Sequence, residues 1–390
     1  MDPLALAIAI ITIVVGGFVS WYTYLGYKRG HSLESSPPCP SAENDDPRST
    51  SERLTSMFWG YPEQGGNCTS WAVKESFVLR GRLEEAREEP GLGVAIVTTE
   101  LAMIAFDGSA ASRIDGVIAW GLGNALPDPP HLIKGKHFDS RTSEERIVPD
   151  FRHTLAFAII LARTGKLMNR VAAYLDYALA RQNPDGGWPA GEGRTKSEVF
   201  TVLYATEFLS LCGGRSELSK EARSRALSSR DQAVNWLLSN TGDEVLWKSG
   251  VLSEYAWDDV ITTAWVLHRL APIEGITAKL WDDTLAHAAY RMISKASRAS
   301  TWQGNSELQR FRVEARVAAA VSRMIETRRF NREIIESMQI YLSDWRRRTE
   351  ALAPKISDVD WDVSTVAFTI EGMFSASELP ECVSNMDLAC

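Results

Sequence analysis

The sequence predicts an all-α protein in which an N-terminal membrane helix carries a ring of helical hairpins. Three observations lead to this fold class. Apolar residues recur at three- and four-residue spacing through most of the chain after residue 55, as in helices with a buried face. Four tryptophans repeat at intervals of 59, 55 and 59 residues, and a period of this size indicates stacked supersecondary units. A stretch of 22 residues without a charge stands near the start of the chain.

The uncharged run extends from Leu4 to Leu25. As a helix it is long enough to cross a bilayer core of about 30 Å. A cleaved signal peptide would carry basic residues before a shorter apolar core, whereas only the tripeptide "MDP" precedes this run. Lys28 and Arg29 follow it, so the positive-inside rule places the rest of the chain in the cytoplasm. We therefore expect residues 1–29 to be a single-pass transmembrane anchor with the main domain on the cytoplasmic side.

The composition bounds the remaining organisation of the chain. Residues 30–54 are rich in Ser, Pro and Asp and predict a flexible tether. Residues 55–380 form the expected helical domain, and residues 381–390 form a C-terminal tail. The net charge of −8 disfavours a nucleic-acid partner. The five cysteines lack the spacing of a disulfide framework or a zinc ribbon, which agrees with a reducing compartment.

The tryptophan period defines a repeated unit. Each unit has a tryptophan in a turn, then a strongly apolar helix, then a more amphipathic helix, while sustained β alternation is absent. The apolar helices are expected at about 68–80, 150–164, 197–212, 257–271, 307–326 and 360–375. The amphipathic helices are expected at about 167–182, 217–239, 277–297 and 331–346. An inner apolar layer and an outer amphipathic layer follow from this contrast, and six inner helices predict closure into a ring. Gly213 and Gly214 are expected to supply the C-cap within one pair.

One of the turns carries a recognisable motif, "QNPDGGWP". Its Gln182, Gly186 and Trp188 are spaced as in the Gln-Trp motif of terpenoid cyclases, and the chain over about 56–376 resembles that superfamily. The superfamily includes squalene-hopene and oxidosqualene cyclases, class II diterpene cyclases and the β subunits of protein prenyltransferases. The resemblance implies an (α/α)6 toroid. It also implies that the Gln amide bridges helix ends and that the Trp stacks beside it, so both residues are expected to be structural.

Acidic residues at the starts of two inner helices are the catalytic candidates. Class II cyclases carry Asp-x-Asp-Asp there and use one protonated carboxylic acid to protonate an alkene or epoxide. The similar stretches here are "DVDWD", with Asp360 and Asp362, and "AWDD", with Asp258 and Asp259. Neither is the complete motif, and acidic residues are also the ordinary caps of helix N-termini. Both interpretations stay open at these four residues.

Aromatic and polar side chains near the same helix starts are the substrate-binding candidates. These are Trp257, Trp361, His153 and Tyr204. In the cyclases, aromatic faces stabilise carbocations by cation–π attraction, which the resemblance implies for these rings. The alternative for each ring is core packing.

No metal or other cofactor is expected. The zinc site of the prenyltransferases needs Asp, Cys and His at a spacing that is absent here, and no P-loop or dinucleotide-binding loop is present. Two classes of function remain. The chain either binds and cyclises an isoprenoid or similar lipid beside the membrane, or it is a non-catalytic toroid that binds a lipid or a protein partner as a tethered scaffold or sensor.

Overall fold

The computed structural model describes residues 118–119, 121–123, 125–139, 144–189, 195–242, 244–249, 258–273, 275–276, 279–298, 307–327, 330–352, 368–369 and 372. All of them belong to one compact unit, Arg48–Cys390. No helix among the described residues is both long and apolar enough to cross a bilayer. The run from Leu4 to Leu25 lies outside the described residues, so the membrane anchor stays a prediction.

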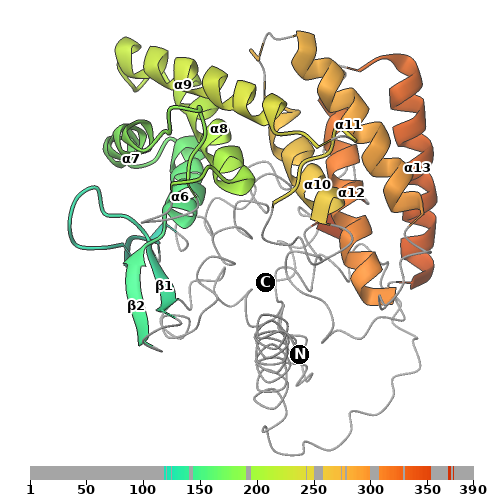
Figure 1. Ribbon diagram of the computed structural model, residues 1–390, viewed down its shortest axis with the longest axis horizontal. Coiled ribbons are helices and arrows are strands. Elements are labelled where there is room, and N and C mark those ends of the chain that lie inside the picture. The colour runs from blue at the N-terminus through green and yellow to red at the C-terminus, as the bar shows by residue number, and fades with distance from the viewer. Residues whose placement is uncertain are drawn as a thin grey trace, which may run out of the picture. The chain divides into compact units, whose positions relative to one another are not determined.

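The described part of the chain is helical, which confirms the all-α class (Figure 1). Its long helices come in pairs, in this order: α6 (Phe151–Thr164), α7 (Met168–Ala180), α8 (Val199–Gly214), α9 (Lys220–Ser239), α10 (Asp258–Leu270), α11 (Lys279–Ser297), α12 (Glu307–Thr327) and α13 (Arg332–Leu352). Each agrees closely with a helix expected from the sequence. The largest difference is at α13, which continues six residues beyond the expected end at 346.

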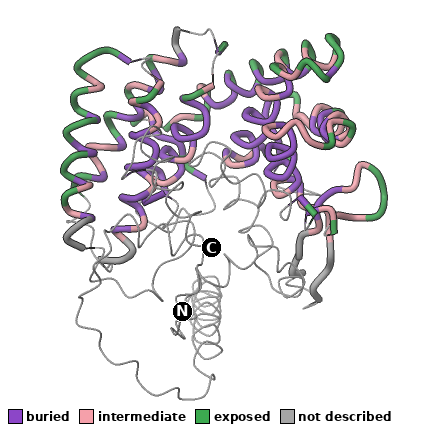
Figure 2. Tube along the Cα trace, turned by 180° about the vertical axis from the view of Figure 1, so that it is seen from behind, coloured by how far each residue is buried: buried purple, intermediate pink, exposed green. Residues whose placement is uncertain are grey.

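The helices form two layers. The even-numbered helices pack in the sequence α6, α8, α10, α12, and the odd-numbered helices in the sequence α7, α9, α11, α13. Each even-numbered helix also packs against the odd-numbered helix that follows it. The even-numbered helices are therefore the predicted inner layer and the odd-numbered helices the outer layer. Figure 2 agrees, because buried residues dominate the inner helices whereas α13 has an exposed side.

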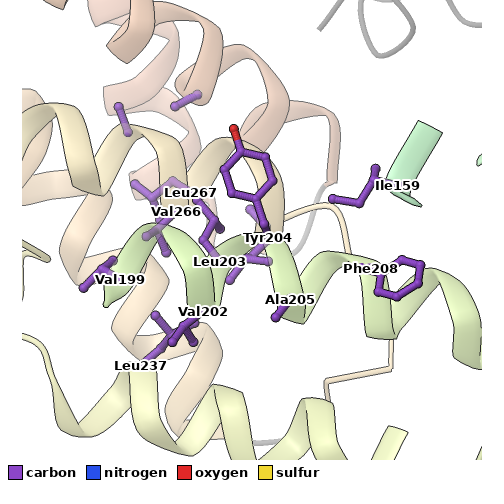
Figure 3. Packing of buried hydrophobic residues seen from close by; sticks show 14 of the residues in the cluster. Ile159, Val199, Val202, Leu203, Tyr204, Ala205, Phe208, Leu237, Val266 and Leu267 are labelled. Atoms are coloured by element: carbon purple, nitrogen blue, oxygen red, sulfur yellow. The ribbon is translucent and has the colours of Figure 1, made fainter. Parts of the chain in front are cut away.

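The core lies between and within these layers. Helix α8 is buried almost all round, from Val199 to Leu209, as expected for an apolar helix with neighbours on every side. Its Leu203 and Phe208 are fully buried, and Val266 and Leu267 of α10 lie in the same cluster (Figure 3). Burial of this many aliphatic side chains, at roughly 1.5–3 kcal/mol each, is the main stabilising contribution to the layered arrangement.

The Gln182 turn joins α7 to α9 as well as to α8. The Gln182 amide nitrogen donates to the Gly186 carbonyl at 2.9 Å and to the Ser229 carbonyl of α9 at 3.1 Å. The Ser229 hydroxyl donates back to the Gln182 Oε1 at 2.6 Å. Trp188 is fully buried, and its indole donates to the Ala178 carbonyl at the end of α7. These contacts tie the end of α7 and the turn to the interior of α9, which agrees with the structural role expected for Gln182 and Trp188.

The same turn geometry recurs 59 residues later. In both turns a backbone N–H bonds the carbonyl four residues ahead, a second N–H bonds the carbonyl three residues back, and the tryptophan indole bonds the carbonyl ten residues back. The pairs are Asn183–Gly187 and Gly242–Leu246, Gly186–Asn183 and Val245–Gly242, and Trp188–Ala178 and Trp247–Leu237. The tryptophan period is therefore a repeat of structure and not only of composition. Trp302 and Trp361 lie outside the described residues.

Two sequence-based expectations were wrong. A β-hairpin, β1 (Lys134–Asp139) paired antiparallel with β2 (Glu144–Pro149), precedes α6 although no strand was expected. Gly213 and Gly214 do not cap α8 but belong to its last turn, and Arg215 follows in an extended conformation. A Cβ on Gly213 would lie 2.3 Å from the Leu227 side chain of α9, so this glycine permits the close approach of α8 to α9.

Candidate functional site

The first candidate residue, Asp258, lies buried at the start of inner helix α10. Its Oδ1 accepts hydrogen bonds from the Thr262 hydroxyl at 3.0 Å, the Ser249 hydroxyl at 2.7 Å and the Ser249 backbone N–H at 3.3 Å. One carboxylate oxygen thus joins the first turn of α10 to the segment before it. These partners are two hydroxyls and a backbone N–H nine residues earlier, not the first backbone N–H groups of α10 that an N-cap side chain would bond.

Asp259, the next residue, forms an ion pair with the outer layer. Its Oδ2 lies 2.6 Å from Lys295 Nζ of α11, and the same ammonium lies 2.6 Å from Glu244. Burial alone would lower the pKa of Lys295, but its hydrogen bonds to Asp259 and Glu244 outweigh burial and raise the pKa. Lys295 therefore stays protonated, and this oxygen of Asp259 is directed to an outer helix rather than to a ligand on the inner side.

His153 lies in the first turn of α6. Its backbone N–H donates to Asp150 Oδ1 at 2.8 Å, and its ring Nδ1 lies 3.1 Å from Asp150 Oδ2. Burial acts to raise the pKa of Asp150, but the hydrogen bonds and charge of His153 and the charge of Arg152 outweigh it, so the pKa lies below its usual value. His153 is thus part of the cap of α6, and it is about one-third exposed.

Tyr204 belongs to an aromatic cluster on the inner helices, which we define as Tyr204 of α8, Trp265 of α10 and Phe368. Trp265 and Phe368 meet edge to face with ring centroids 5.2 Å apart. The cluster is covered by arginine: the Arg269 guanidinium lies 4.3 Å from the Tyr204 centroid and 5.7 Å from that of Trp265. Arg316 of α12 lies 5.2 Å from the Phe368 centroid. Guanidinium groups therefore already occupy cation–π positions over all three rings.

A buried ion-pair triad connects three inner helices beside this cluster. Glu207 of α8 is 1% exposed and pairs with Arg163 of α6 through one oxygen. Its other oxygen lies 2.8 Å from Nε of Arg269, which is itself fully buried. Burial raises the pKa of the neighbouring Tyr204 well above its ordinary value, so its hydroxyl is neutral. Sequence reasoning missed this triad, although a lone glutamate within the apolar stretch "LYATEFLSL" was the available signal.

The structure does not describe the remaining candidate residues. Asp360, Asp362, Trp257 and Trp361 lie outside the described residues. Among the described residues no group of His, Cys, Asp and Glu could hold a metal ion. Burial raises the pKa of Cys212 to about 12, so this thiol is neither an activated nucleophile nor a prepared metal ligand.

Comparisons with known proteins add no relative. A scan against protein-family models finds no match, and searches of the curated proteins and of the solved structures also find none. The resemblance to the terpenoid-cyclase superfamily therefore stays a prediction.

Proposed function

We propose that this chain is a membrane-anchored toroid of the terpenoid-cyclase type that binds an isoprenoid or similar lipid without converting it. The arginine-covered aromatic cluster is the observation that carries this proposal. In a cyclase the same type of aromatic surface faces a developing carbocation. Here Arg269 and Arg316 lie over those faces, so the cluster suits an anionic ligand better than a cationic intermediate.

The fold part of this proposal has support from the repeat. Four inner and four outer helices alternate in the order that a toroid requires, and the Gln182 turn has the bonding pattern expected of a Gln-Trp motif. The two remaining inner helices would come from residues 68–80 and 360–375, and these would close the ring.

Electrostatics disfavour a carbocation on this surface. Two unit charges about 5 Å apart repel by roughly 3 kcal/mol at an effective dielectric constant near 20. A cation placed against Phe368 would meet this repulsion from Arg316, and against Tyr204 or Trp265 it would meet Arg269, whose charge is partly offset by the paired Glu207. One oxygen of each described acid candidate is also engaged by the protein itself, Asp258 by Ser249 and Thr262 and Asp259 by Lys295.

The charges of the inner layer define the ligand class. Arg163 and Arg269 pair with one buried carboxylate, Glu207, and Arg316 lies over the apolar ring of Phe368. An anionic head group on an apolar chain complements both features, since guanidinium groups bind carboxylate and phosphate well. The predicted anchor at residues 4–25 would keep the domain beside the membrane in which such lipids dissolve.

The lipid can be identified directly. Full-length protein is purified from membranes in mild detergent, and bound lipid is extracted and analysed by mass spectrometry. We expect an anionic lipid to be retained by the wild type and largely lost from Arg316→Gln. Arg332→Gln is the matched control, because Arg332 is 91% exposed and lies away from the aromatic cluster on α13.

Three results would overturn the proposal. One is a wild type that retains no lipid, a second is equal retention by both variants, and the third is formation of a cyclised product from a polyprenyl or squalene-like substrate. A protein partner that co-purifies in place of lipid would favour the scaffold alternative. The topology is tested separately with a C-terminal tag, which protease added outside intact cells should not reach.

A further inference from the structure

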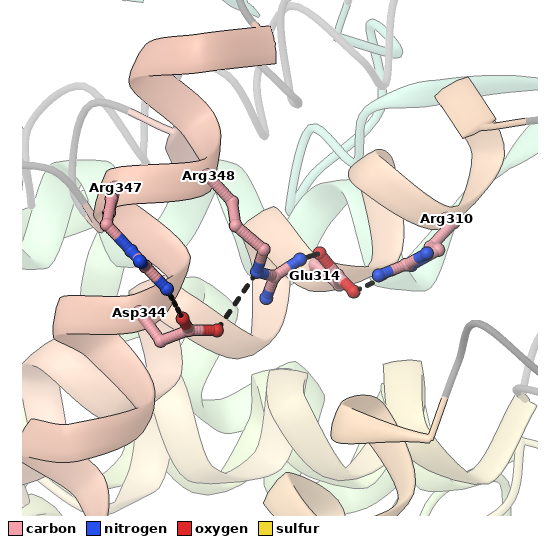
Figure 4. Close-up of polar contacts among 5 residues, drawn as sticks. All are labelled: Arg310, Glu314, Asp344, Arg347 and Arg348. Atoms are coloured by element: carbon pink, nitrogen blue, oxygen red, sulfur yellow. Dashed lines mark hydrogen bonds and ion pairs between the residues drawn. The ribbon is translucent and has the colours of Figure 1, made fainter.

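A chain of alternating charges links the last two described helices (Figure 4). Arg310 of α12 donates to Glu314 at 3.0 Å, and Arg348 of α13 donates to the other oxygen of Glu314 at 2.7 Å. Arg348 also donates to Asp344 at 3.1 Å, and Arg347 donates to the same carboxylate at 2.7 Å. We call these five residues the arginine ladder.

The ladder holds its arginines in fixed positions while leaving donors free. Glu314 is 3% exposed and sits between two guanidinium groups, so it orients Arg310 and Arg348 with little freedom to move. Within the described residues, these contacts leave both terminal nitrogens of Arg310 and one terminal nitrogen of Arg348 without a partner. Pre-oriented guanidinium donors are the usual means by which proteins bind phosphate oxygens, because little entropy is lost on binding.

The charge of this hairpin also differs from that of the chain. Residues 307–352 hold ten arginines and seven acidic residues, whereas the whole chain has a net charge of −8. Arg347 is 80% exposed at the solvent side of the ladder. Within α13 the arginines and acidic residues are equal in number, so attraction of an anionic partner is expected at the exposed guanidinium groups of the ladder rather than over the whole helix.

We propose that the arginine ladder is a docking surface for the anionic head groups of the membrane beside which the chain is tethered. A flexible tether over residues 30–54 spans about 25–30 Å on average, so it would hold the domain close to the bilayer. The cytoplasmic leaflet is the anionic one, and basic side chains near it gain binding energy. This inference depends on the predicted anchor but not on what the aromatic cluster binds.

A phosphorylated peptide offers the same phosphate oxygens, but the membrane is favoured because its head groups would be present at a high local concentration. The tether would keep the ladder permanently near a surface with many head groups, and several weak contacts then act together. A soluble phosphopeptide would instead have to bind tightly through a single contact.

Hydrogen–deuterium exchange of the full-length chain tests the proposal. The protein is mixed with excess nanodiscs, made either of phosphatidylcholine alone or with one quarter phosphatidylserine. Exchange in α13 around residues 344–348 should slow in the phosphatidylserine discs by about five-fold for each arginine engaged. The slowing should disappear in about 0.5 M NaCl, where charges are screened within a few ångströms.

Two variants make the test specific to the ladder. Arg347→Glu should abolish the phosphatidylserine-dependent slowing. Arg332→Glu makes the same charge change on the same helix and also breaks one surface pair, Arg332 with Glu336, but it should leave the slowing intact. Equal exchange of the wild type in the two kinds of disc would overturn the proposal, and so would equal loss in both variants. Slowing by inorganic phosphate but not by phosphatidylserine would assign the ladder to a soluble phosphorylated partner instead.

Discussion

Gly186 offers the sharpest test of the turn that carries the family resemblance. Its φ is +90°, and a Cβ added there would lie 2.7 Å from the backbone carbonyl oxygen of Gln232 on α9. The positive φ costs an alanine about 1–2 kcal/mol. The contact with a helix backbone cannot be relieved by a side-chain rotation, and such overpacking costs about 1–3 kcal/mol. Alanine also loses less entropy on folding, which returns about 0.4–1 kcal/mol. We expect Gly186→Ala to lower the free energy of unfolding by about 1–5 kcal/mol in total.

Gly214→Ala is the matched control, because the identical substitution should have the opposite effect. Gly214 lies in the last turn of α8, has no positive φ, and an added Cβ would meet no atom within 4 Å. The helix preference of alanine should then stabilise the protein by up to about 1 kcal/mol. Both changes in unfolding free energy can be measured by chemical unfolding of the full-length chain in mild detergent, with circular dichroism as the readout. If Gly186→Ala changed the unfolding free energy no more than Gly214→Ala does, the geometry assigned to this turn would be wrong.

Three further predictions concern other parts of the domain. Trp188→Ala and Trp247→Ala should each lower the free energy of unfolding by about 3–5 kcal/mol, because both rings are fully buried and make equivalent hydrogen bonds. Thermal unfolding measures this, and a loss of stability at only one of the two sites would contradict the structural repeat. Tyr341→Phe should stabilise the protein by about 1 kcal/mol in the same experiment, because the buried Tyr341 hydroxyl finds no hydrogen-bond partner among the described residues; a loss of stability would reveal a partner. Asp360→Asn and Asp362→Asn should leave lipid retention unchanged and alter stability by a few tenths of a kcal/mol, as for caps, whereas a wild-type cyclisation activity that either variant abolishes would restore the enzyme interpretation.

The helical part of the fold was predictable because it depends on patterns that survive in sequence. An inner helix such as α8 must be apolar on every side, and an outer helix such as α9 must expose one side, so hydrophobic periodicity separates them. The tryptophan period was informative for a related reason. Trp188 and Trp247 fill equivalent buried positions, and each donates a hydrogen bond to the end of the preceding outer helix. Few other side chains can fill such a volume and also donate this bond.

The features that sequence reasoning missed depend on contacts between distant segments. The β1–β2 hairpin lacks the sustained alternation of a half-buried strand pair, so no period-two signal was available. The glycines in "CGG" were assigned to a cap because glycine is common there. The actual reason for Gly213 is the nearness of Leu227, which follows only from the packing of α8 on α9.

The candidate site shows the same limit more clearly. The resemblance implies catalytic acids at helix starts, yet the carboxylates of Asp258 and Asp259 contact Ser249, Thr262 and Lys295. A local motif does not predict which residues contact a carboxylate, because the partner can be distant in sequence. Lys295, for example, is 36 residues away from Asp259. A motif can therefore identify a helix start without showing which distant groups its carboxylates contact.

The arginines of the inner layer favour the binding proposal, because their charges cannot be removed. A guanidinium remains protonated at any physiological pH, so Arg269 and Arg316 present permanent positive charge to the rings of Tyr204, Trp265 and Phe368. An enzyme that needs those rings for a carbocation would have to move both arginines, and Arg269 is held at one end by buried Glu207. Breaking such a buried pair is costly, typically about 3–5 kcal/mol when one partner is lost. A ligand with a negative head group requires no such movement, and this is the physical reason for preferring binding to cyclisation.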